Sequence, residues 1–152
     1  MSDAPTLQEQ QRAAGAVPVD APNGPRPMIR RVLRWVLAVA MVAVGVRHFT
    51  DPEPFVRIVP AALPAKLALV WISGAAEVLG GVGLLVPRAR RWAGYGLIAL
   101  YVAVFPANVN MALNHLPLGD AVMPTWALWA RLPMQAVLIA LAWWVSRDDD
   151  AR

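Results

Sequence analysis

The sequence LALVWISGAAEVLGGVGLLV, residues 67–86, is the most informative stretch of the chain about its fold. These twenty residues contain a single charged side chain, that of Glu77. A helix rises about 1.5 Å per residue, and crossing the hydrocarbon core of a bilayer takes roughly 20 apolar residues. The stretch therefore predicts a transmembrane helix.

Three further segments have similar length and apolar character, at residues 32–49, 92–113 and 126–145. Strand-like alternation of apolar and polar residues is absent from all of them. Stretches that contain proline separate the four segments, at residues 52–64, 87–91 and 117–124. We therefore predict an all-α fold, an integral membrane four-helix bundle with four transmembrane helices.

The composition of the 152-residue chain agrees with this prediction. The chain is 58% hydrophobic and 16% charged, whereas a soluble domain is about 45–50% apolar and about 25% charged. A chain of this length cannot bury so many apolar side chains in water, so the lipid bilayer is the expected partner. The chain has no cysteine, which excludes disulfides, thiolate metal sites and thiol relays. Its basic residues form no single stripe, so no nucleic-acid partner is expected.

The charges predict the domain organisation and the orientation. Residues 1–31 are expected to form a disordered cytoplasmic tail with a basic juxtamembrane cluster, residues 32–146 the transmembrane domain, and residues 147–152 a short charged tail. Ten basic residues fall on the side of the termini and of residues 87–91, and three on the other side. The positive-inside rule then places both termini in the cytoplasm. The single lysine among fourteen basic residues indicates a GC-rich bacterial coding sequence, so the expected location is a bacterial (plasma) membrane. Cleavage of the first segment as a signal peptide is the alternative, but it would leave an apolar core of only about six residues.

Two ionisable residues, Glu77 and Arg131, lie well inside the predicted spans. Each costs at least about 2.5–3.5 kcal/mol to place there, so both are expected to face the bundle interior. Glu77 lies about 15 Å into its helix, and small residues one turn away on its face let another helix approach. The stem of Arg131 can reach over the depth difference of about 7 Å, so an ion pair between the two is plausible. One interpretation is that this pair serves helix packing alone. The other is that it marks a ligand-binding or proton-handling site.

Further polar side chains fall in the same outer half of the predicted bundle. His48 ends the first segment, Asn108 lies about 24 Å from the cytoplasmic side, and Gln135 lies one turn beyond Arg131. The predicted ligand-binding residues are therefore His48, Glu77, Asn108, Arg131 and Gln135, converging in a pocket that opens outward. The alternative for His48 is a place at the membrane interface, which is also the stronger interpretation of Asn110 and Asn114. No catalytic motif is readable, and neither a haem nor a metal is expected as cofactor.

Four motifs appear in the order of a known family. They are Gly45-Val46-Arg47-His48-Phe49 followed by Pro52, Phe55, Pro60 and Leu63-Pro64, then Ser73-Gly74-Ala75-Ala76-Glu77, Phe105-Pro106-Ala107-Asn108 and Arg131-Leu132-Pro133-Met134-Gln135. Over about residues 32–145 the chain resembles the DoxX-like family of four-span bacterial membrane proteins. The resemblance implies a four-helix inner-membrane protein, and the family takes its name from a subunit linked to thiosulfate:quinone oxidoreductase.

Three functions follow as expectations. The first is an accessory or quinone-contacting subunit of a membrane redox system, with quinone as the ligand and other subunits of the redox complex as partners. The second is a structural or assembly protein in which a Glu–Arg pair serves packing. The third is a small-ligand or proton-coupled transport protein, which with only four helices would need a homo-oligomer.

Overall fold

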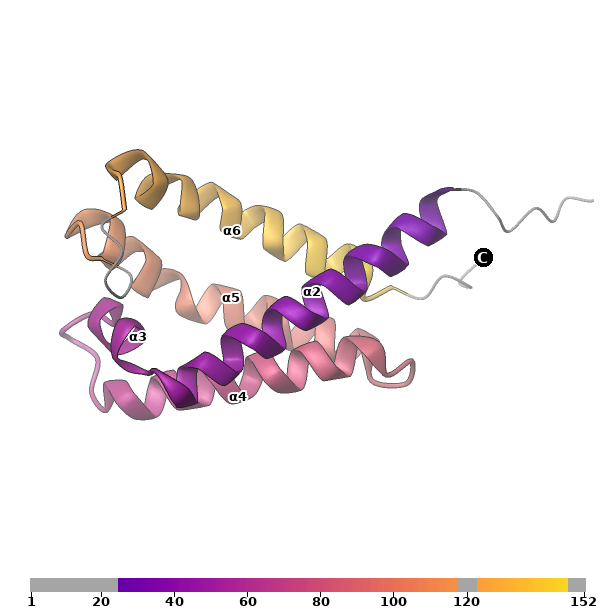
Figure 1. Ribbon diagram of the computed structural model, residues 1–152, viewed down its shortest axis with the longest axis horizontal. Helices are drawn as coiled ribbons and strands as arrows, with labels where there is room; N and C mark the ends of the chain where they lie inside the picture. Colours follow the sequence, from indigo (N-terminus) through magenta and orange to yellow (C-terminus); the bar gives the residue numbers. More distant parts are fainter. Residues whose placement is uncertain (1–24, 118–122, 148–152) are drawn as a thin grey trace, which may run out of the picture.

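The computed structural model describes residues 25–117 and 123–147, and within them the chain forms five helices and no strand (Figure 1). The helices are α2 (Pro25–Thr50), α3 (Glu53–Ile58), α4 (Lys66–Leu85), α5 (Arg90–Leu113) and α6 (Thr125–Val145). The all-α prediction is confirmed. The predicted tails fall largely on residues 1–24 and 148–152, outside the described residues.

Three of the helices, α4, α5 and α6, are long and apolar enough to cross a membrane. Each begins and ends within two residues of the predicted span. The helix α2 begins at Pro25, seven residues before the predicted start of its segment. Proline is tolerated in the first turn of a helix because the N–H that it lacks has no intrahelical partner there. The basic cluster predicted for the end of the tail is therefore helical.

The short helix α3 lies in a connection that was predicted only as a break. Pro54 occupies its first turn, where proline does not interrupt hydrogen bonding. Arg57 and Glu53 form an i,i+4 ion pair of 3.2 Å on its exposed side. Its other side buries Pro54 and Ile58, so α3 is a short amphipathic helix that packs on the bundle.

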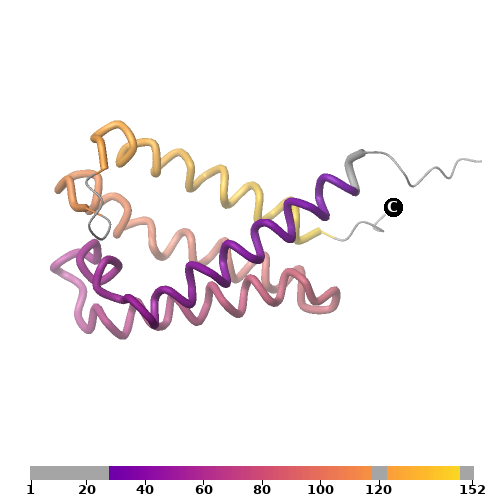
Figure 2. The backbone as a smooth tube through the Cα atoms, viewed as in Figure 1, coloured from indigo at the N-terminus to yellow at the C-terminus, as the bar shows by residue number. Residues whose placement is uncertain are grey.

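The four long helices run alternately up and down the bundle (Figure 2). The helix α2 packs along α4, α4 contacts α5, and α5 packs along α6. We call the inner end the one that holds the start of α2, the α4–α5 turn and the end of α6, and the outer end the opposite one, where α3 lies (Figure 1). The helices α2 and α6 approach each other near the inner end and diverge toward the outer end.

Two apolar clusters hold this arrangement. The cluster toward the inner end joins all four long helices and contains Leu37, Ala38, Met41, Leu84, Leu97, Tyr101, Ala142 and Val145. The cluster at the outer end contains Ile58, Met111, Ala112 and Leu128. Because Ile58 belongs to α3, this second cluster fixes α3 across the outer ends of α5 and α6.

Candidate functional site

Close backbone contact between α2 and α4 brings His48 and Glu77 together. A Cβ atom added to Gly74 would lie 2.5 Å from the Cβ atom of His48, and one added to Gly45 would lie 2.7 Å from the carbonyl oxygen of Gly74. Only glycine permits this approach of two helices. As a result His48 Nδ1 lies 3.3 Å from Glu77 Oε2, with the two side chains 8% and 13% exposed.

The imidazole of His48 is fixed from two sides. Its Nδ1 lies 2.9 Å from the carbonyl oxygen of Val44, and its ring stacks on Phe55 of α3 at 3.8 Å between centroids. Two oxygen atoms near Nδ1 assign the proton to that nitrogen, because a carbonyl oxygen accepts and does not donate. The Nδ1–H donates to Val44, so Glu77 Oε2 is buried without a hydrogen-bond partner.

A second polar group joins α5 and α6. Asn108 donates from Nδ2 to Gln135 Oε1 at 2.9 Å, and Gln135 donates from Nε2 to the carbonyl oxygen of Tyr101. That carbonyl lies in the turn before Pro106, where the proline weakens the helical hydrogen bonding. Arg131 donates from Nη2 to Asn108 Oδ1 at 3.5 Å, while its Nε is buried without a hydrogen-bond partner.

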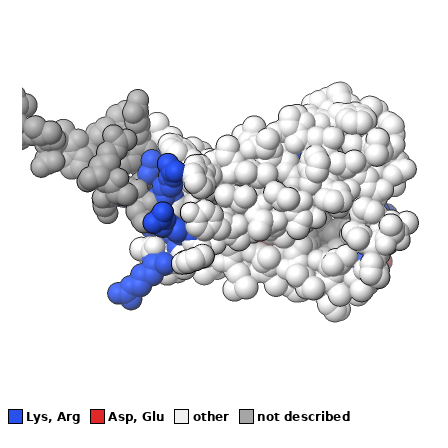
Figure 3. Space-filling model, turned by 180° about the vertical axis from the view of Figure 1, so that it is seen from behind, with Lys and Arg blue, Asp and Glu red and all other residues white. Residues whose placement is uncertain are grey.

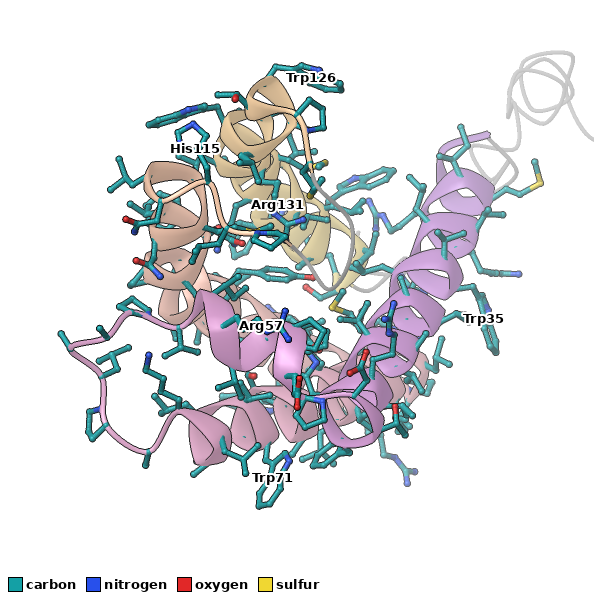
Figure 4. All side chains as sticks on the ribbon, turned by 60° about the vertical axis from the view of Figure 1, so that its left-hand side comes forward. Trp35, Arg57, Trp71, His115, Trp126 and Arg131 are labelled. Atoms are coloured by element: carbon teal, nitrogen blue, oxygen red, sulfur yellow. The ribbon has the colours of Figure 1, made fainter. Side chains whose placement is uncertain are left out.

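Tyr101 lies between the two groups. Its backbone oxygen accepts from Gln135, and its hydroxyl donates to the sulfur of Met41 in α2 at 3.1 Å. Figure 4 shows Arg131 on the side of α6 that faces the other helices, whereas Trp71 and Trp126 point away from the bundle. The structure thus places the five predicted residues in two groups, His48 with Glu77 and Asn108 with Arg131 and Gln135.

The plausible Glu77–Arg131 ion pair is not formed within the described residues. Glu77 lies against His48, and Arg131 contacts Asn108. The reason is the pairing of the helices: the glycine on the face of Glu77 admits α2, whereas α6, which carries Arg131, pairs with α5. His48 is 7% exposed and is therefore buried within the bundle.

Three residues of the site were missed from the sequence, namely Met41, Phe55 and Tyr101. Tyr101 is a hydroxyl-bearing residue inside an apolar span, which is a signal that could have been used. Phe55 stands in the loop part of the first motif, and Met41 has no comparable signal. Asn110 has a structural role, because its Nδ2 donates to the last carbonyl oxygen of α3, that of Ile58, at 2.9 Å.

A hollow on the surface near α3 is separate from these groups. Its lining residues are Pro52, Glu53, Val56, Arg57 and Leu67. None of the five predicted residues lines it, so it is not the predicted pocket.

Comparison with known proteins gives a family. The sequence model of a domain of unknown function (DUF8561) matches residues 37–146, which contain most of α2, all of α3 to α6 and the two polar groups. The matching family is not the DoxX-like family that the motifs resemble. No curated protein and no solved structure matches the chain. Because the match covers well over half of its length, the chain belongs to the DUF8561 family.

Proposed function

We propose that α2 is a fourth transmembrane helix beside the three candidate spans. Its 26 residues correspond to about 39 Å of helix, enough for a bilayer core. Large apolar side chains remain exposed along one of its sides, at Val32, Val36, Val39 and Val46. These positions recur every three, four or seven residues and so share a helix face, which supports contact with lipid.

The distribution of charge supports a cytoplasmic inner end. Figure 3 shows the arginines gathered toward one end of the visible face, with the middle of that face uncharged. The basic residues at the inner end are Arg30, Arg31, Arg34, Arg88, Arg90, Arg91 and Arg147, and those toward the outer end are Arg47, Arg57 and Lys66. By the positive-inside rule, this distribution supports a cytoplasmic position for the richer end, with the protein in a bacterial inner membrane.

Single-cysteine labelling tests this topology, because the chain has no cysteine of its own. We expect a membrane-impermeant maleimide to label Ala62→Cys in intact spheroplasts. Met28→Cys and Ala89→Cys should be labelled only after the membrane is disrupted. Labelling of Met28→Cys together with Ala62→Cys would show that α2 does not cross the membrane.

The function that the geometry supports best is binding of a quinone-type headgroup by an accessory subunit of a membrane redox system. The observation that carries this proposal is that two half-buried ionisable side chains each have a buried atom without a hydrogen-bond partner, Arg131 Nε and Glu77 Oε2. Buried polar atoms are nearly always hydrogen-bonded, so an orphaned atom at membrane depth indicates a missing ligand or water.

The chemistry of the two groups fits such a ligand. The guanidinium of Arg131 donates to a carbonyl oxygen, which a quinone provides. Tyr101, Met41 and Phe55 supply apolar and aromatic surface next to the polar atoms. A quinone also has an apolar tail, which can remain in the lipid while the headgroup binds.

Mass spectrometry of small molecules extracted from the purified protein tests this function. We expect a quinone to copurify with the wild type in a mild detergent and to fall at least tenfold in Arg131→Ala, because removal of a charged hydrogen-bond donor costs about 1.5–3 kcal/mol. Arg57→Ala is the matched control, since Arg57 is exposed on α3 and pairs with Glu53. A wild type without quinone, or equal retention in both variants, would contradict the proposal.

A structural or assembly role is the second candidate. It is favoured by the hydrogen bonds from Asn108 to Gln135 and from Gln135 to Tyr101, which satisfy these amides within the bundle. In that case Glu77→Gln should change only the stability of the protein. Loss of bound quinone from a fully folded Glu77→Gln variant would instead favour ligand binding. A transport role, which would require a homo-oligomer, stays a prediction.

A further inference from the structure

We propose that the inner ends of α5 and α6 form a binding site for an anionic phospholipid. The site combines an aromatic surface at the depth of the acyl chains with arginines at the depth of the headgroup. It lies at the opposite end of the bundle from α3 and does not depend on the proposed quinone site.

The aromatic surface consists of three rings in contact. Tyr95 lies between Trp92 of the same helix, at 6.2 Å between ring centroids, and Trp143 of α6, at 6.3 Å. All three rings are exposed, by 77% for Trp92, 46% for Tyr95 and 44% for Trp143. Gly96 lies one turn after Trp92 on the same face, and a Cβ atom added there would meet nothing within 4 Å. The rings therefore border an open, apolar stretch of helix that an acyl chain can cover.

Arg147 lies directly beside these rings, and Arg91 is the residue before Trp92 in α5. The backbones of α5 and α6 cross closely at Gly94, where an added Cβ atom would lie 2.3 Å from the side chain of Ser146. Arg91 precedes this crossing by one turn and Arg147 follows Ser146. The guanidinium of Arg147 lies 4.3 Å from the ring centroid of Trp143, which orients its charge over the aromatic surface.

The charge at this end calls for an anionic partner. Within the described residues the acidic side chains are Asp51, Glu53 and Glu77, which lie in the middle or at the outer end of the bundle. Other arginines of the inner end bind protein: Arg34 donates to the carbonyl oxygen of Val145, and Arg90 to that of Leu84. Arg91 and Arg147 are exposed and form no ion pair within the described part of the chain. An anionic headgroup at a membrane surface is the partner that such arginines attract.

Lipid competition in detergent tests the site with the full-length chain, in which three aspartates follow Arg147. Native mass spectrometry would compare binding of phosphatidylglycerol and phosphatidylcholine with the same acyl chains. We expect the wild type to prefer phosphatidylglycerol and the double variant Arg91→Gln, Arg147→Gln to lose this preference. A cation near the surface changes the affinity for an anionic lipid about fivefold, so the double change should reduce binding of phosphatidylglycerol about 25-fold.

Three controls distinguish the proposal from general charge effects. Arg47→Gln removes the same charge from the other end, where Arg47 pairs with Asp51, and should keep the preference. The wild-type preference should also fall in 0.5 M NaCl, which screens exposed charges, and this holds even if the double variant fails to fold. Glycerol phosphate alone should not displace the lipid, since it cannot cover the aromatic surface. A preference unchanged in the folded double variant, or its absence from the wild type, would overturn the proposal.

Discussion

Replacing Gly74 by alanine should destabilise the protein by about 1–3 kcal/mol, the usual cost of overpacking. The added Cβ atom would lie 2.5 Å from the Cβ atom of His48 and 2.9 Å from the carbonyl oxygen of Gly45. Neither atom is the end of a flexible side chain, so α2 must move away from α4. Because His48 itself is displaced, we expect its contact with Glu77 to lengthen and any ligand bound there to be lost.

Gly96→Ala is the matched control for Gly74→Ala. Both substitutions replace a glycine inside a helix by alanine. This replacement by itself stabilises a helix by roughly 0.5–1 kcal/mol. At Gly96 nothing lies within 4 Å of the added atom, so the substitution should be neutral or stabilising. Unfolding followed by the fluorescence of the seven tryptophans would measure both variants. Equal stabilities of the two variants would show that the α2–α4 contact is looser than the structure places it.

The fold could largely be predicted because the length and apolar composition of a segment determine whether it can span a membrane, almost regardless of which apolar residues it contains. The apolar run at residues 67–86, which contains only one charged residue, predicts both ends of α4 to within one residue. The start of α2 and the helix α3 were harder, because both contain prolines that a sequence pattern marks as breaks. In the structure the prolines at the start of α2 and in α3 occupy first helical turns, where they are tolerated.

The candidate site was harder to predict than the fold. Depth along each helix selected five residues, and the structure buries His48 and Gln135. Depth does not tell which helices are neighbours, so Glu77 was matched with Arg131 rather than with His48. The glycines at positions 45 and 74 are the signal that pairs α2 with α4, and they can be interpreted only once the two helices are known to pack together.

Replacing Arg34 should have a still larger effect on stability than replacing Gly74. Arg34 is 4% exposed, and it donates from Nε to the carbonyl oxygen of Val145 at 2.7 Å and from Nη2 to that of Arg147 at 3.2 Å. These carbonyl groups belong to the C-terminal end of α6, where backbone oxygens lack helical partners and the helix dipole is negative. Arg34 thus caps α6 from α2. Hydrogen bonds to charged groups contribute about 1.5–3 kcal/mol each, so losing both should cost about 3 kcal/mol or more.

Arg34→Met is the sharpest variant because it keeps the apolar stem of the side chain and removes only the guanidinium. Arg31→Met, one turn earlier and exposed, removes the same charge from the same end and should change stability by no more than about 0.5 kcal/mol. If both arginines served only to orient the protein in the membrane, the two variants would have equal stabilities in an unfolding titration in detergent micelles. The structure predicts a large difference, because of these two arginines Arg34 is the one that donates hydrogen bonds to the end of α6, and α2 and α6 diverge toward the outer end. An Arg34→Met variant as stable as Arg31→Met would mean that the inner end is held by its apolar cluster alone.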